Sequence, residues 1–166
     1  MSDQGKTYGS FIEAELAAER DRRNRFDDRG VSLVKTSGSL VTLLAAVVAF
    51  LRTGREYQFP RDAVGPLMLA LTFLTIAAMA GIVTSLNRAY EVPNPPTLRK
   101  LLEERWAVDS EVSARNFVGE MQVHIIHSLR KGSNWKAKFL LTGLIAQVVA
   151  LLALTVVVYI ILLAYA

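Results

Sequence analysis

The chain has 166 residues, of which 52% are hydrophobic, and a formal net charge of +4. It contains no cysteine, which excludes disulfide bonds and thiolate metal sites. Its 19 Lys and Arg residues are interleaved with 15 Asp and Glu residues and only 8% of the chain is aromatic, so no nucleic-acid-binding surface is expected.

Residues 1–30 are predicted to form a charged helix outside the membrane. Ser10 opens a capping-box pattern, which predicts that the helix starts there. Acids and bases spaced three or four residues apart, such as Glu19 and Arg22, are typical of an exposed helix. Gly30 offers a bend before the membrane. The narrow apolar side fits either a solvated helix or an oligomer seam.

Three apolar segments have about the 20 residues that a helix needs to cross a bilayer. Residues 63–86 and 139–166 carry no charged side chain. Residues 31–51 reach spanning length only with Lys35 included, whose ammonium can extend to the headgroups. The alternative for this first segment is a buried hairpin that does not cross. The short link at 52–62 favours a transmembrane hairpin. The charged stretch ahead of the first segment has no cleavage motif, so no removable signal is expected.

Residues 87–138 are predicted to form a helical segment outside the membrane. The proline-rich run at 93–96 should stop the preceding helix. Thr97 is the expected cap of a short helix, and Asp109 or Ser110 that of a longer helix with a broad apolar side. A segment of this length cannot bury a large core alone. Its apolar faces are therefore expected to pack on the amino-terminal helix, the membrane or another subunit.

The Lys and Arg residues predict the orientation of the spans. Most of them flank the first span or lie in 87–138, whereas the link holds only Arg52, Arg55 and Arg61. By the positive-inside rule, the amino terminus and 87–138 are predicted to be cytoplasmic, and the link and the carboxyl terminus to lie outside. The expected location is therefore the cytoplasmic (inner) membrane, with several passes through the lipid bilayer.

One polar cluster in 87–138 suggests chemistry. Glu120, His124 and His127 stand at positions i, i+4 and i+7 and share one helical face. Two imidazoles and a carboxylate could hold zinc or divalent iron. The HEXXH arrangement of helical zinc sites is absent. We therefore interpret this face as a solvated polar surface, or as histidines near headgroups, and expect no metal.

The sequence lacks the motifs of the common catalytic sites. It has neither a glycine-rich phosphate loop nor a Gly-x-Ser-x-Gly nucleophile elbow. We therefore expect no catalytic residue and no cofactor, and the protein is not predicted to be an enzyme. The interiors of the spans also lack acids and arginines, which disfavours an ion-coupled transporter.

Small and polar residues in the spans predict close helix packing, because they let backbones approach in lipid. The candidate packing residues are Gly38, Thr42, Ala77, Gly81, Ser85 and Gln147. Gln147 is expected to hydrogen-bond to Thr72, to Thr75 or to the same residue of a neighbouring copy. A homo-oligomer is the expected state.

The order of these elements resembles that of small bacterial membrane proteins of the SLATT and Pycsar-effector type. The resemblance rests on ERDRRNRFDDRGVSLVKTSGSLVTLL before a close membrane hairpin and on LRKGSNWKAKFLLTGL before the last span. It implies a membrane-disrupting or pore-forming effector of antiphage nucleotide signalling. The third span departs from the two-span core of SLATT proteins, and no ligand-binding residue is carried over.

The predicted fold is therefore all-α, with three transmembrane helices and a helical cytoplasmic segment between the second and third. The predicted function is that of a non-enzymatic, oligomeric membrane effector in antiviral defence. It would perturb or permeabilise the membrane in response to a cytoplasmic cue, such as a nucleotide second messenger or a signalling partner. The alternative is a structural or accessory membrane subunit that anchors a partner protein.

Overall fold

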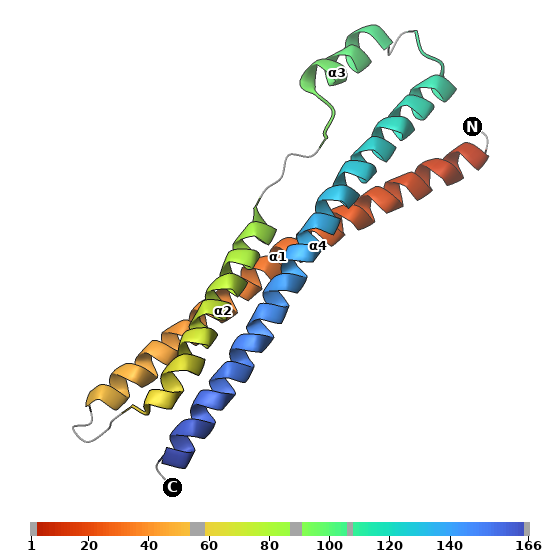
Figure 1. Cartoon of the computed structure of the whole chain (residues 1–166). Helices are drawn as coiled ribbons and strands as arrows, with labels where there is room; N and C mark the ends of the chain where they lie inside the picture. Colours follow the sequence, from red (N-terminus) through yellow and green to blue (C-terminus); the bar gives the residue numbers. More distant parts are fainter. Residues whose placement is uncertain (1–2, 54–58, 87–90, 106–107, 165–166) are drawn as a thin grey trace. The chain divides into compact units, whose positions relative to one another are not determined.

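The computed structural model describes residues 3–53, 59–86, 91–105 and 108–164, and every regular element in these ranges is helical (Figure 1). The three long helices are α1 (Asp3–Thr53), α2 (Arg61–Ser85) and α4 (Glu111–Ala164). A short helix, α3 (Pro95–Lys100), lies between α2 and α4 and continues into a π-helical turn at Leu101–Arg105. The predicted all-α class is confirmed.

Each of the long helices contains a stretch long and apolar enough to cross a membrane. The predicted spans at 31–51, 63–86 and 139–166 fall on α1, α2 and α4, respectively, except that Leu86 follows the last residue of α2 and residues 165–166 lie outside the described ranges. Of the predicted link, residues 54–58 lie outside the described ranges. The chain thus has three candidate membrane spans, which indicates a multi-pass membrane protein. The short helix α3 separates the second span from the third.

The helix starts differ from two of the predicted caps. The start at Ser10 was wrong, because α1 begins at Asp3 and the Ser10 hydroxyl donates to the Thr7 carbonyl instead. The cap at Thr97 was also wrong, since α3 begins at Pro95 and proline is well tolerated in a first helical turn.

The cap predicted for the last helix is confirmed at Ser110. The backbone N–H of Ser113 donates to the Ser110 Oγ at 3.2 Å. The helix that begins there then runs for 54 residues without interruption. The predicted cytoplasmic helix and the third predicted span are therefore one helix. In the same way, α1 continues through Gly30.

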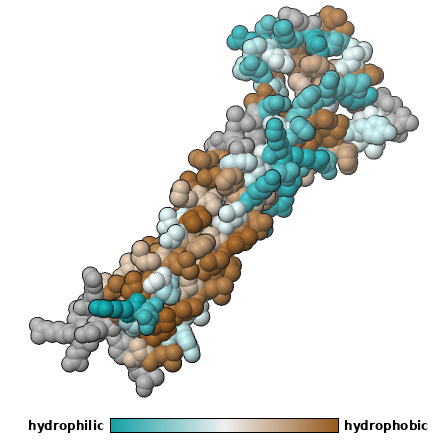
Figure 2. Space-filling view, viewed as in Figure 1, coloured by the Kyte–Doolittle hydropathy of each residue, from teal (hydrophilic) through white to brown (hydrophobic). Residues whose placement is uncertain are grey.

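The chain divides into two compact units. The charged unit comprises residues 1–25 and 87–135, and the apolar unit comprises 26–86 and 136–166. Figure 2 shows apolar residues gathered over the helices of the apolar unit and hydrophilic residues gathered over the charged unit. The two units meet in sequence a few residues before the predicted first and third spans.

The apolar unit is held by close packing of α1, α2 and α4. Its buried cluster consists of Leu33, Ala77, Leu140 and Ala146, with Phe26 and Phe73 packed against it. Two glycines mark the contact of α1 with α2. A Cβ at Gly81 would lie 2.7 Å from the Gly30 carbonyl oxygen, and one at Gly30 would lie 2.9 Å from the Gly81 oxygen. No side chain fits between these two backbones.

Replacing Gly81 by Ala should therefore destabilise the apolar unit. The added Cβ would overlap backbone atoms of α1, and overpacking of this kind costs about 1–3 kcal/mol. The measurement is the thermal unfolding midpoint of the purified protein in detergent. The matched control is Gly65→Ala on the same helix, where a Cβ meets nothing within 4 Å. Equal midpoints for the two variants would contradict the assigned contact.

Candidate functional site

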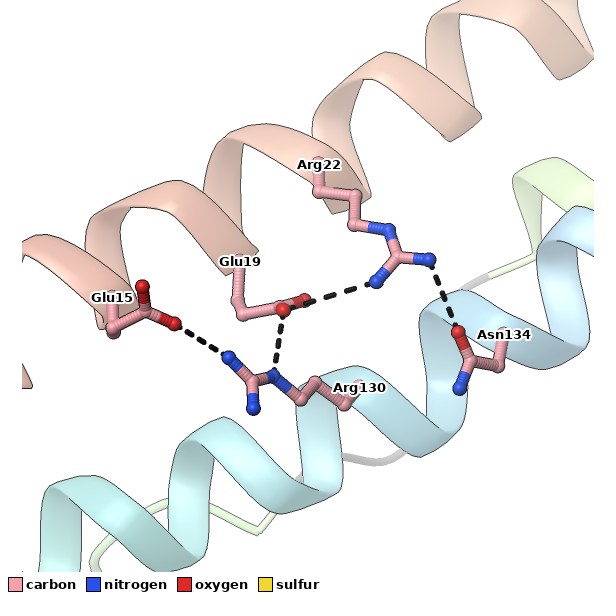
Figure 3. Close-up of polar contacts among 5 residues, drawn as sticks. All are labelled: Glu15, Glu19, Arg22, Arg130 and Asn134. Atoms are coloured by element: carbon pink, nitrogen blue, oxygen red, sulfur yellow. Dashed lines mark hydrogen bonds and ion pairs between the residues drawn. The ribbon is translucent and has the colours of Figure 1, made fainter.

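Five polar side chains join α1 to α4 within the charged unit (Figure 3). The Nε of Arg130 donates to Glu19 at 2.8 Å, and its Nη2 donates to Glu15 at 2.5 Å. The Nη2 of Arg22 donates to the Asn134 side chain at 3.1 Å. One guanidinium thus bridges two carboxylates that stand one turn apart on α1.

The bridged carboxylates differ in exposure. The Glu19 side chain is 9% exposed and that of Glu15 is 38% exposed. The hydrogen bond to Glu19, together with the charges of both carboxylates, raises the pKa of Arg130 against the opposing effect of burial. Like any arginine, Arg130 is charged at every physiological pH. The apolar part of the same contact is a buried cluster of Leu16, Ile126 and Leu129.

A second ion pair joins the same two helices inside the apolar unit. The Lys136 Nζ donates to the Asp27 Oδ1. The Lys136 side chain is fully buried, and that of Asp27 is 27% exposed. A buried ammonium is tolerated only with a charged, hydrogen-bonded partner. The pair therefore fixes the register of α1 against α4 just before both helices enter their apolar segments.

Sequence reasoning treated Lys136 only as a cation beside the membrane. A usable signal was its position. Asp27 lies four residues before the apolar segment that starts at Val31, and Lys136 lies three residues before the one that starts at Phe139. Two helices that enter a membrane side by side in the same direction would bring such residues to one level.

The predicted polar cluster on α4 does not form a compact site. Glu120, His124 and His127 are all exposed. Glu120 lines a hollow of about 840 Å³ with the first turns of α1, whereas His124 lines a separate hollow with Glu91 and its neighbours. Within the described part of the chain, no three His, Asp or Glu side chains are placed to hold a metal ion.

The predicted packing residues fall into two groups. Ala77 and Gly81 are buried in the contact of α2 with its neighbours, and Ser85 is half-buried beside them. Gly38 and Thr42 lie on an exposed side of α1. A Cβ at Gly38 would meet nothing within 4 Å, and the Thr42 hydroxyl donates to the Gly38 carbonyl at 3.0 Å.

The exposed side of α1 also carries polar residues that the sequence argument did not group together. Lys35, Ser39 and Thr42 are all exposed, and they lie at three- and four-residue spacings on one helical face. The small residues of that face are Gly38, Ala45, Ala46 and Ala49, which are exposed as well. By contrast, the exposed residues of α4 in the apolar unit are mostly large and aliphatic, such as Leu141, Ile145 and Leu152.

Gln147 is half-buried and lines a groove between α1 and α4. It makes no hydrogen bond to any residue that the structure describes. The hydroxyls of Thr72 and Thr75, its predicted partners, donate instead to carbonyls four residues back in their own helix. A hydrogen bond to Gln147 of a second copy stays a prediction.

Comparison of the chain with protein-family models, curated proteins and solved structures found no match.

Breaking the buried ion pair should destabilise the apolar unit strongly. Replacing Asp27 by Asn leaves the Lys136 ammonium buried without its counter-charge, which costs about 3–5 kcal/mol in comparable pairs. The measurement is again the unfolding midpoint in detergent. Adding Lys136→Met to Asp27→Asn should recover much of the loss, because it removes the uncompensated charge.

The neighbouring Asp28 supplies the matched control for this prediction. It is exposed, and the described part of the chain offers it no hydrogen bond or ion pair. Asp28→Asn should therefore change the stability by no more than about 0.5 kcal/mol. Equal losses for the two Asp→Asn variants would show that the pair is not buried as described.

Proposed function

We propose that the protein is a non-enzymatic, oligomeric membrane effector that permeabilises the cytoplasmic membrane in response to a cytoplasmic cue. The observation that carries this proposal is the exposed face of α1 that bears Lys35, Ser39 and Thr42, which we call the polar face. Its small members are Gly38, Ala45, Ala46 and Ala49.

The polar face is poorly suited to lipid tails. Ionisable side chains such as Lys35 within membrane segments almost always face a protein partner, water or the headgroups. The leucine-rich exposed side of α4 has the opposite character and suits lipid. In a ring of several copies, part of the polar face would contact the neighbouring copy and the rest would line a water-filled path.

Oligomerisation is required for such a path, because three helices packed around a filled core leave no channel. The small residues of the polar face permit close approach of another helix, as they do in other membrane helix pairs. Gly38 leaves room for such an approach, since a Cβ there meets nothing within 4 Å. We therefore assign the subunit contact to this face.

The charged unit is the proposed sensor and, by the positive-inside rule, lies in the cytoplasm. Both α1 and α4 contribute to it and continue into the apolar unit. Its hollow of about 840 Å³ is lined by Tyr8 and Arg115 among others. An exposed aromatic ring and a guanidinium suit a nucleotide, whose base can stack and whose phosphate can pair. A cue that prefers one arrangement of the helices would shift their populations.

The resemblance to SLATT and Pycsar-effector proteins supports the same proposal, including a role in antiviral defence. The competing proposal is an accessory subunit that anchors a partner protein. It is favoured by the large exposed apolar residues beside α3: Val92 is 72% exposed, Val108 is 84% exposed, and α3 has no buried residue. These residues lie in the charged unit, where a soluble partner would bind.

The proposal predicts that overproduction in bacteria, with the cognate cue where one is needed, depolarises the membrane. Gly38→Leu should abolish the depolarisation, because a bulky side chain on the polar face blocks close approach of a second copy. The readout is a potential-sensitive dye, with the oligomer size in detergent measured in parallel. The protomer should stay folded, since no residue that the structure describes comes within 4 Å of a Cβ at Gly38.

The matched control is Gly65→Leu on α2, another helical glycine with open space around it. It should leave both depolarisation and oligomer size unchanged. An intact membrane potential at high expression, together with co-purification of one stoichiometric partner, would reject the effector in favour of the accessory subunit.

A further inference from the structure

The groove between α1 and α4 that Gln147 lines plays no part in the proposed function. It encloses about 310 Å³ within the apolar unit. Arg29, Ser32 and Thr36 line it from α1, and Leu140, Leu144 and Gln147 line it from α4. We propose that this groove binds one anionic phospholipid, with the phosphate on Arg29 and an acyl chain along the leucines.

The charge of Arg29 is available for a ligand. Its side chain is exposed, and the structure gives it no hydrogen bond or ion pair to any described residue. This contrasts with the paired Lys136 and Arg130 on the facing helix. A guanidinium recognises phosphate through two parallel N–H bonds. Arg29 therefore offers a specific anion contact at the mouth of the groove.

The residues of the groove lie at successive depths that match the phosphate, the glycerol esters and the acyl chains of a phospholipid. Arg29 stands two residues before the first apolar segment, and Leu140 is in the first turn of the third. Ser32 lies about 4.5 Å further along α1 at 1.5 Å per residue, where its hydroxyl can donate to a glycerol ester carbonyl. Leu144 lies deeper on α4 and is exposed, so the groove is open to lipid at the depth of the acyl chains.

The groove is large enough for a segment of an acyl chain. A dry apolar cavity of about 150 Å³ is sufficient to bind benzene in a soluble protein. The volume here is about twice that, and the leucines supply the apolar walls. A free phosphate would use Arg29 alone and leave these walls uncovered. The shape and chemistry of the groove therefore favour a lipid over a soluble anion.

A second copy of the chain is a poorer occupant. The predicted spans contain no Asp or Glu that could enter the groove below Arg29. The polar face, where we place the subunit contact, is a different part of the surface of α1, because neither Lys35 nor Gly38 lines the groove. The lipid site is thus independent of whether the protein permeabilises membranes.

The test uses the purified full-length protein in detergent, titrated with phosphatidylglycerol or phosphatidylcholine. Bound lipids are counted by native mass spectrometry. We expect one phosphatidylglycerol to be retained more tightly than phosphatidylcholine. Arg29→Gln should weaken phosphatidylglycerol binding about fivefold, the effect of one cation on an anionic lipid, and leave phosphatidylcholine unchanged.

The matched control is Lys138→Gln, which removes an exposed cation beside the third apolar segment but outside the groove and should leave the affinity for phosphatidylglycerol unchanged. A second variant, Leu144→Trp, fills the groove from its exposed side and should weaken both lipids. Soluble glycerol phosphate should not compete, because it lacks the acyl chain. Equal losses for the Arg29 and Lys138 variants, competition by glycerol phosphate, or no preference for the anionic lipid would overturn the proposal.

Discussion

The low polarity of lipid hydrocarbon is the constraint on which the arrangement of the apolar unit depends. It favours helices, because a helix satisfies its own backbone groups. It also removes the hydrophobic drive between helices, so they must be held by close contact and by polar pairs. In this chain, the backbones of α1 and α2 meet at Gly30 and Gly81, and α1 and α4 are tied by Asp27 and Lys136.

These contacts leave α1 with surfaces of distinct character. One side packs on α2 through Gly30, and another forms a groove with α4 beside Arg29. The polar face around Gly38 and Thr42 is exposed in the protomer, although it lies in a segment apolar enough to cross a membrane. The exposed polar face is the basis for proposing an oligomer, and the groove beside Arg29 is the basis for proposing a bound lipid.

The sequence predicted the features that depend on composition over a long stretch. The uncharged runs at 63–86 and 139–166 identified two of the long helices directly, since length and apolar content decide them. Single-residue signals were less reliable: Ser110 was a true cap, whereas Ser10 and Thr97 were not. Ser133 and Lys136 lie in the segment that was predicted to be helical and outside the membrane, yet both are buried, and their burial depends on tertiary packing that the local sequence does not reveal. The contact of Asp27 with Lys136 joins residues 109 positions apart, and its signal in the sequence is the similar distance of each residue from the start of an apolar segment.

The central claim, that α1, α2 and α4 each cross the bilayer, is tested most directly by accessibility. Because the chain has no cysteine, single cysteines can be placed at Tyr8, Asp62 and Val108 and appended after Ala166, and probed in intact cells with a membrane-impermeant maleimide. The account predicts that the cysteines at Asp62 and after Ala166 are labelled, and that those at Tyr8 and Val108 are labelled only after permeabilisation. Protection of the cysteine at Asp62, with those at Tyr8 and Val108 also protected, would contradict the account by showing that α1 does not cross.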